Sequence, residues 1–140
     1  MRLAMTLSLP QQPSSVTRAR EVLTSLLRLI DATEECRSDL AILITEASAN
    51  AIIHGDLGSR VDLTITIEDD LCVLEIGNRG NLNGATLTTE PPGPTQVCGR
   101  GLPLIAALSD TAAFVPAPPG QILLRMTRHL TALAPTPRAA

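Results

Sequence analysis

Residues 61–76 read VDLTITIEDDLCVLEI, and this stretch decides the fold. Apolar and polar side chains alternate along residues 61–68, a period of two that is typical of a strand with one buried face. Asp69 and Asp70 predict a tight turn into a second strand over residues 71–76. The core face of that second strand is expected to hold Cys72, Leu74 and Ile76. The pattern therefore predicts a β-hairpin with one face packed on a core.

One strand and one helix are predicted ahead of this hairpin. Residues 3–9 also alternate between apolar and polar side chains, which indicates a first strand that ends at Pro10. Ser14 or Ser15 can cap the following helix, because a hydroxyl there accepts from the free amides of the first turn. Apolar residues recur at helical spacing as far as Ile30. The arginines expected on the solvent side of this helix are Arg18, Arg20 and Arg28.

A second helix is predicted from about Arg37 to His54, and Gly55 is expected to end it. Its packing stripe should consist of Leu40, Ile44, Ala47 and Ala51. No membrane span is predicted here, because Glu46 and Asn50 lie in the middle of the apolar stretch. The first ten residues also lack the apolar core of a signal peptide. We therefore expect a cytoplasmic protein.

Beyond the hairpin, residues 77–101 are dominated by Gly, Pro, Asn and Thr, and so long a connection is expected to be functional. A short helix is predicted over residues 102–108, then strands over residues 112–115 and 121–127 joined by a turn at residues 116–120. This order predicts a two-layer α/β (α+β) sandwich, with a mostly antiparallel sheet and the helices on one face.

The length of 140 residues predicts a single domain over residues 1–130, followed by a flexible tail over residues 131–140. The net charge is -3 and only 1% of residues are aromatic, which argues against direct nucleic-acid binding and against an anionic membrane surface. All 11 basic residues are Arg, so a Walker-type lysine and a Schiff-base lysine are excluded. Three widely spaced cysteines predict neither a disulfide framework nor a zinc site.

Glu46 and Asn50 are four residues apart, so both side chains project from one face of the second helix. A carboxylate and an amide oxygen are ligands that suit Mg²⁺ when phosphates complete its coordination shell. The alternative is an ordinary solvated stripe on an amphipathic helix. His54 extends the row by one turn, but the helix dipole explains a histidine at that end without any ligand.

Two glycine-containing turns are the other candidate binding elements. Asn78 lies between Gly77 and Gly80, where the backbone can approach a flat ligand and the amide oxygen can accept from an amino group. Residues 99–101 read Gly-Arg-Gly directly before the short helix, so backbone amides, the helix dipole and a guanidinium converge on an anion. The alternatives are a plain strand-to-loop turn and a hinge beside a surface arginine.

The order of these features resembles one family. Residues 45–55, TEASANAIIHG, resemble the N box of the GHKL (Bergerat-fold) ATPases, in particular the anti-sigma-factor serine kinases of the RsbW type. Residues 78–80 resemble their first glycine box, which is usually Asp-x-Gly, and residues 99–104 resemble the second. The resemblance extends from the first strand to about Thr127.

The resemblance implies a Bergerat ATP-binding fold in which residues 81–98 form a lid over ATP and Mg²⁺. Glu46 would orient or deprotonate the attacking hydroxyl, and Asn50 would bind Mg²⁺. The residues implied to bind the nucleotide are Asn50, Asn78, Gly80, Gly99, Arg100, Gly101 and Leu102. Such proteins phosphorylate a serine on a small antagonist, the anti-anti-sigma protein, and otherwise bind and inhibit a sigma factor. They often form homodimers.

Asn78 departs from the family pattern, since the usual aspartate offers a charged acceptor to the adenine amine. The loss of that charge is worth on the order of 1 kcal/mol, or about tenfold in affinity. A second hypothesis is therefore a partner-sequestering module that binds ATP weakly or not at all. A third, the catalytic part of a histidine kinase, is disfavoured because 140 residues hold no phosphoacceptor helix pair.

Overall fold

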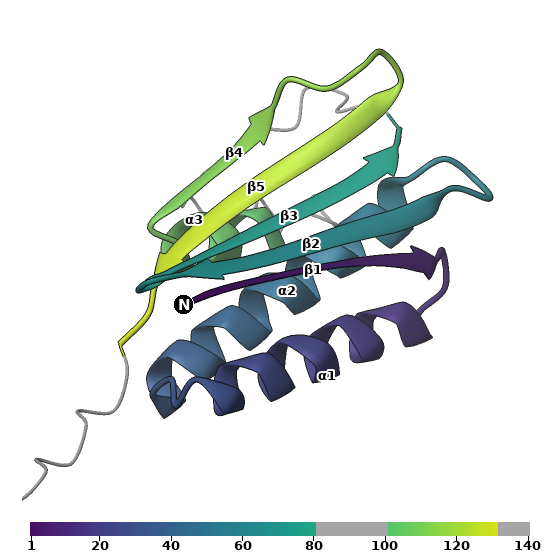
Figure 1. The fold of residues 1–140 in the computed structure, drawn as a ribbon. Coiled ribbons are helices and arrows are strands. Elements are labelled where there is room, and N and C mark those ends of the chain that lie inside the picture. The colour runs from purple at the N-terminus through teal and green to yellow at the C-terminus, as the bar shows by residue number, and fades with distance from the viewer. Residues whose placement is uncertain (81–100, 132–140) are drawn as a thin grey trace, which may run out of the picture.

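The hairpin of residues 61–76 lies at the centre of a five-stranded sheet in the computed structural model, which describes residues 1–80 and 101–131 (Figure 1). The strands lie in the order β1-β2-β3-β5-β4, and each neighbouring pair is antiparallel. The strands are β1 (Arg2–Pro10), β2 (Arg60–Glu68), β3 (Leu71–Arg79), β4 (Thr111–Val115) and β5 (Gln121–His129). The helices are α1 (Ser14–Leu29), α2 (Glu34–His54) and α3 (Gly101–Leu108).

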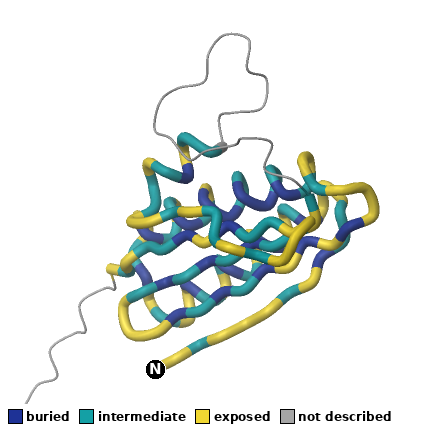
Figure 2. Tube along the Cα trace, turned by 90° about the horizontal axis from the view of Figure 1, so that it is seen from above, coloured by how far each residue is buried: buried dark blue, intermediate teal, exposed yellow. Residues whose placement is uncertain are grey.

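The three helices lie on one face of the sheet, so the predicted two-layer sandwich is confirmed (Figure 1). The core lies between the layers, where the inward side chains of β2 and β3 meet the packing stripes of α1 and α2. The alternation predicted for β2 is present, with every second residue buried. β1 is an edge strand whose only buried residue is Leu9, and the tube beginning at the N-terminus is accordingly mostly exposed in Figure 2.

The predicted serine cap of α1 is wrong. Pro13 occupies the N-cap position and no side chain caps the helix. The Ser15 hydroxyl instead donates to the Pro10 carbonyl at 2.6 Å and so ties the start of the helix to the end of β1. Pro13 fits here because it has no amide hydrogen and its φ of -56° suits the beginning of a helix.

The boundaries of two further elements differ from the prediction. α2 begins at Glu34 rather than near Arg37, because the Thr33 side chain accepts from the Cys36 amide at 3.3 Å and acidic residues occupy the first turn. β3 continues to Arg79 rather than ending at Ile76. Gly77 and Asn78 look like turn residues in the sequence, but they pair with β5. The long connection therefore starts later than predicted.

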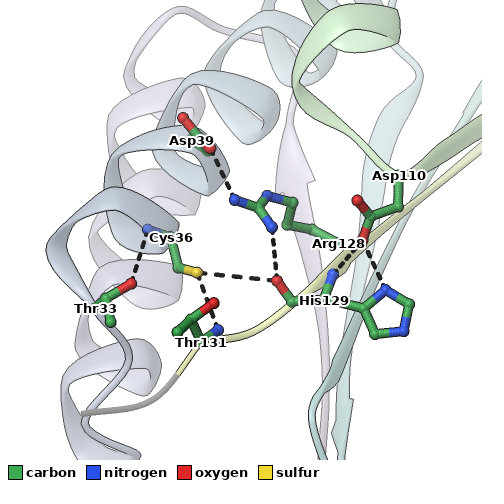
Figure 3. A network of polar contacts seen from close by, with 7 residues as sticks. All are labelled: Thr33, Cys36, Asp39, Asp110, Arg128, His129 and Thr131. Carbon is green, nitrogen blue, oxygen red and sulfur yellow. Dashed lines mark hydrogen bonds and ion pairs between the residues drawn. The ribbon is translucent and has the colours of Figure 1, made fainter.

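A network of polar contacts joins the start of α2 to the end of β5 (Figure 3). Arg128 of β5 donates to the Asp39 carboxylate of α2 at 3.0 Å, and this pair is mostly buried. The Cys36 thiol accepts from the Thr131 amide at 3.1 Å. His129 contacts Asp110 through its ring at 2.8 Å. These contacts fix the N-terminal part of α2 to β5. The candidate site residues lie further along the same helix.

Candidate functional site

The last turn of α2 packs against the end of β3, and this contact brings the N-box segment to the first glycine turn. The Asn78 side-chain nitrogen donates to the Ala51 carbonyl of α2 at 3.3 Å and to the Arg79 carbonyl at the same distance. The Asp56 amide, just after the helix, donates to the Arg79 carbonyl at 2.8 Å. Gly80 is held in turn by its amide, which donates to the Gly120 carbonyl at 3.0 Å.

Gly55 is required at this junction because its backbone lies too close to its neighbours for any side chain. A Cβ atom there would lie 2.6 Å from the Ala51 carbonyl oxygen and 2.9 Å from the Asn78 side-chain nitrogen. Gly80 is more tolerant, with its nearest contacts at 3.2 Å to the Ile122 side chain and 3.3 Å to the His54 carbonyl. The predicted role of Gly55 as the end of α2 is confirmed, and its close approach explains why the residue is glycine.

The orientation of Asn78 has a chemical consequence. Because Nδ2 donates to two carbonyl groups, Oδ1 is the atom left to accept from a ligand. An ionised aspartate has no hydrogen to donate to those carbonyls. The asparagine therefore anchors the end of α2 in a way that an ionised aspartate at this position could not.

Glu46 and Asn50 both lie on α2, one turn apart and half-buried. Neither side chain forms a hydrogen bond or ion pair with another residue in the described ranges 1–80 and 101–131. The helix turns its buried stripe, which includes Leu43 and Ala47, toward the core, and the two polar side chains lie beside that stripe. Within the part of the chain that the structure describes, both oxygen-bearing groups are therefore open to a ligand.

The second glycine turn is described only in part. Gly99, Arg100 and the predicted lid of residues 81–98 lie outside the described residues. The predicted helix is present as α3, but it begins at Gly101, one residue before the predicted start at Leu102, and it packs on α2. Leu102 is half-buried against the core, while Ile105 one turn later is completely buried. The packing of α3 on α2 therefore fixes the position of this helix from Gly101 onward.

The family model of the histidine kinase-like ATPase domain matches residues 9–128. The chain belongs to this family. The resemblance to the GHKL ATPases is thereby confirmed. The matched range spans the N box, both glycine turns and strands β2 to β5.

Two relatives of this ATPase domain are anti-sigma F factors. The one from Bacillus velezensis is 27% identical over 123 residues, and the one from Bacillus subtilis is 26% identical over 123 residues. Each comparison covers 81% of this chain and 83% of the relative. The crystal structure of the RsbU and RsbW domains of Rv1364c from Mycobacterium tuberculosis matches with a TM-score of 0.72 and 18% identity, covering 96% of this chain and 35% of that chain. That likeness confirms the fold.

An open groove of about 980 Å³ lies on the sheet face that the helices leave uncovered. The strand residues Asp62, Thr64 and Glu75, which alternate with buried neighbours, form its floor. Asn78 borders this groove, but Glu46 and Asn50 do not. The groove therefore shares Asn78 with the predicted nucleotide site but does not include the two candidate residues of α2.

Two residues near the site could not be identified as site residues from the sequence. Gln11 forms three hydrogen bonds with the end of α2 and the loop after it, although its partners lie 41 to 47 residues away along the chain. Ser59 is buried behind Gly55, and its hydroxyl has no hydrogen-bond partner among the described residues. Neither residue belongs to a periodic pattern or a motif, so only the fold reveals them.

None of the described helices combines enough length with enough apolar character to cross a bilayer. The described residues also contain no group of three or more His, Cys, Asp or Glu side chains that could hold a metal ion. A divalent cation at this site would therefore need phosphate oxygens in addition to Asn50 and Glu46. That requirement fits Mg²⁺, which keeps several waters and is usually shared with substrate phosphates.

Proposed function

We propose that this ATPase domain is an ATP-dependent serine protein kinase and anti-sigma factor of a partner-switching system. The observation that carries the proposal is the docking of the last turn of α2 on Asn78, which joins the N box to the first glycine turn. Membership of the histidine kinase-like ATPase family supports the use of ATP, and the named relatives support the anti-sigma role. The phosphorylated partner would be a small anti-anti-sigma protein with an acceptor serine.

Each proposed role follows from the chemistry of its side chain. Asn78 would accept from the adenine amino group through Oδ1, and Gly80 would let the backbone approach the base. Gly99, Arg100, Gly101 and Leu102 would surround the phosphates at the start of α3, where amide groups and the helix dipole favour negative charge. Glu46 would orient the serine hydroxyl toward the γ-phosphate.

Asn50 is the side chain that would hold Mg²⁺, together with the phosphates of ATP. When bound, the ion would neutralise charge on the phosphates during transfer. Asn50 suits this position because a neutral oxygen ligand leaves the ion its full attraction for phosphate. Glu46, one turn earlier, would lie close enough to share the coordinating waters.

A partner-sequestering module that does not turn over ATP is the alternative, and Asn78 is the observation that favours it. The neutral amide is a weaker acceptor for the adenine amine than a carboxylate, and Nδ2 is already engaged by the protein. In both proposals the chain acts in the cytoplasm, without contacting nucleic acid or membrane, and can act as a homodimer.

Phosphate transfer tests the kinase directly. The full chain is incubated with Mg-ATP and a candidate antagonist, and phosphoserine is quantified by mass spectrometry. We expect Glu46→Gln and Asn50→Ala to lower the transfer rate at least 100-fold, on the scale of losing alignment of the reacting groups. Glu35→Gln, which changes an exposed acid in the first turn of the same helix, is the matched control and should transfer at the wild-type rate.

Robust transfer by both site variants would contradict the assigned roles. Calorimetry with ATP and ADP, each with and without Mg²⁺, separates the two proposals. Absence of nucleotide binding at millimolar concentration would favour the sequestering module, whereas Mg²⁺-dependent ATP binding would favour the kinase.

A further inference from the structure

The Gln11 side chain bridges three backbone groups around the end of α2. Its amide nitrogen donates to the Ile52 carbonyl at 3.0 Å and to the Gly55 carbonyl at 3.0 Å. Its amide oxygen accepts from the Gly58 amide at 2.9 Å. Gln11 itself belongs to the connection between β1 and α1, so one side chain joins that connection to the helix end and to the following loop.

These three bonds fix a loop that has direct contact with the candidate base-binding residue. Carbonyl groups in the last turn of a helix have no partner within the helix, and Gln11 supplies one for Ile52. The backbone of Gly55 lies against the Asn78 side chain, and the Asp56 amide donates to the Arg79 carbonyl. The position of Asn78 therefore depends on where the loop of residues 55–58 lies.

Among the described residues around the end of α2, no other side chain forms the bridge that Gln11 forms. The Ser59 hydroxyl lies behind Gly55, but it has no hydrogen-bond partner among the residues that the structure describes. The bridge also needs a donor and an acceptor on one planar group, because it contacts two carbonyls and one amide. Of the side chains of this length, glutamine meets that requirement at every pH.

We propose that Gln11 is a positioning residue for the nucleotide base. The inference rests on the proposed function, because it assumes that Asn78 accepts from the adenine amine. Gln11 holds the loop of residues 55–58 against β3, and the loop keeps Asn78 in the orientation in which Nδ2 donates to the two carbonyls and Oδ1 is the acceptor presented to a ligand. Gln11 acts through Asn78 and does not touch the nucleotide.

Base discrimination distinguishes this role from a general contribution to folding. Adenine presents an amino group to an acceptor, whereas guanine presents a carbonyl oxygen at the same place, so a fixed Oδ1 favours ATP over GTP. Without Gln11 the Asn78 side-chain amide can rotate, so the preference for ATP over GTP should become smaller. A residue that only stabilised the fold would lower the fraction of active protein without changing the ratio of the two affinities.

The test is calorimetry of the full chain with Mg-ATP, and with Mg-GTP in competition. For Gln11→Ala we expect the Kd for ATP to rise about tenfold and the ATP-to-GTP preference to fall by a similar factor, with the binding stoichiometry unchanged. Gln12→Ala removes the neighbouring exposed glutamine side chain and is the matched control. It should bind both nucleotides like the wild type.

Gln11→Glu is the second variant, and it preserves side-chain length if the alanine variant folds poorly. It keeps an acceptor for the Gly58 amide but loses the donor to the two carbonyls, so we expect a rise in Kd at least as large. Wild-type affinity and preference in the Gln11 variants, with weakened ATP binding in Asn78→Ala, would overturn the positioning role alone. A wild-type chain that binds no nucleotide would overturn both this inference and the kinase.

Discussion

Asn78 serves the fold and the proposed site at the same time. Its nitrogen anchors the last turn of α2, while its oxygen accepts no hydrogen bond from residues 1–80 and 101–131. Compared with the aspartate that is usual in the family, Asn78 lacks a negative charge for binding the ligand. It gains a hydrogen-bond donor that bonds to the protein backbone. We therefore expect the substitution Asn78→Asp to lower the stability of the fold.

We expect Asn78→Asp to lower the free energy of unfolding by about 1–3 kcal/mol, because the carboxylate cannot donate to the Ala51 and Arg79 carbonyls and lies close to them. Urea denaturation followed by circular dichroism measures the change. Asn78→Ala also removes the donor but adds no charge, so it should destabilise less. An aspartate variant as stable as the wild type would show that the two donated bonds contribute nothing.

Cys36 and Cys72 are both buried, yet their environments differ. Burial raises the pKa of the Cys72 thiol to about 12. Burial also acts to raise the pKa of Cys36, but hydrogen bonds with Thr33 and Thr131 and the positive charge of Arg128 outweigh it and bring that pKa below 9.0. At a given pH the thiolate fraction is therefore larger for Cys36.

In a Cys98→Ala background, iodoacetamide should modify Cys36 faster than Cys72 at pH 8. Both rates should rise with pH, and Cys36 should stay ahead of Cys72 across the range because its pKa is lowered while that of Cys72 is raised. Peptide mapping by mass spectrometry at a series of pH values measures both rates. Equal rates throughout would refute the difference in thiol environment.

At the scale of elements, the Arg128–Asp39 ion pair fastens β5 to α2. The pair is mostly buried, with side-chain exposures of 18% and 22%, and the Asp39 hydrogen bond is the main cause of a raised pKa for Arg128. Arg125 forms a more exposed pair with Glu75, at 50% and 25%. The two pairs extend from the same strand and allow a matched comparison.

Arg128→Ala should lower the free energy of unfolding by about 1.5–3 kcal/mol, because it leaves the Asp39 carboxylate partly buried without its partner. Arg125→Ala should cost less than about 1 kcal/mol. A double-mutant cycle with Asp39→Ala, measured by urea denaturation, isolates the pair. A coupling energy indistinguishable from zero would contradict the role of this ion pair.

The elements that the sequence predicted best are those with a regular apolar period. β2 shows every second residue buried, and the stripe of α2 is buried as expected, since a periodic pattern directly reflects which face meets the core. The errors lie at boundaries. The sequence predicts too early an end for β3, because Gly77 and Asn78 have turn propensities that pairing with β5, more than 40 residues away, overrides.

The candidate site was predictable to the extent that it depends on local spacing. Glu46 and Asn50 share a helix face by arithmetic alone, but the contact of Asn78 with Ala51 joins residues 27 apart. Gln11 could not have been predicted, because its partners belong to another part of the chain and its neighbours give no pattern. Long-range hydrogen bonds of single polar side chains leave no trace in a local sequence.

At the scale of the whole molecule, one core connects all three helices to the sheet. Residues from α1, α2, α3, β2, β3 and β5 are buried in the same cluster, so no part of it can open without exposing the rest. We therefore expect a single cooperative unfolding transition. Helix content from circular dichroism and the accessibility of the Cys72 thiol to a chromogenic reagent should follow the same urea curve. Separate midpoints would show that the helical layer and the sheet unfold independently.

β5 occupies an interior position in the sheet although it is the last strand along the part of the chain that the structure describes. Its first residues, Gln121 and Ile122, pair with Arg79 and Asn78. During synthesis the first glycine turn therefore cannot pair with β5 until β5 has left the ribosome. Until then the edge of β3 stays unpaired, and a nascent chain halted before Gln121 would offer that edge to chaperones or to other chains.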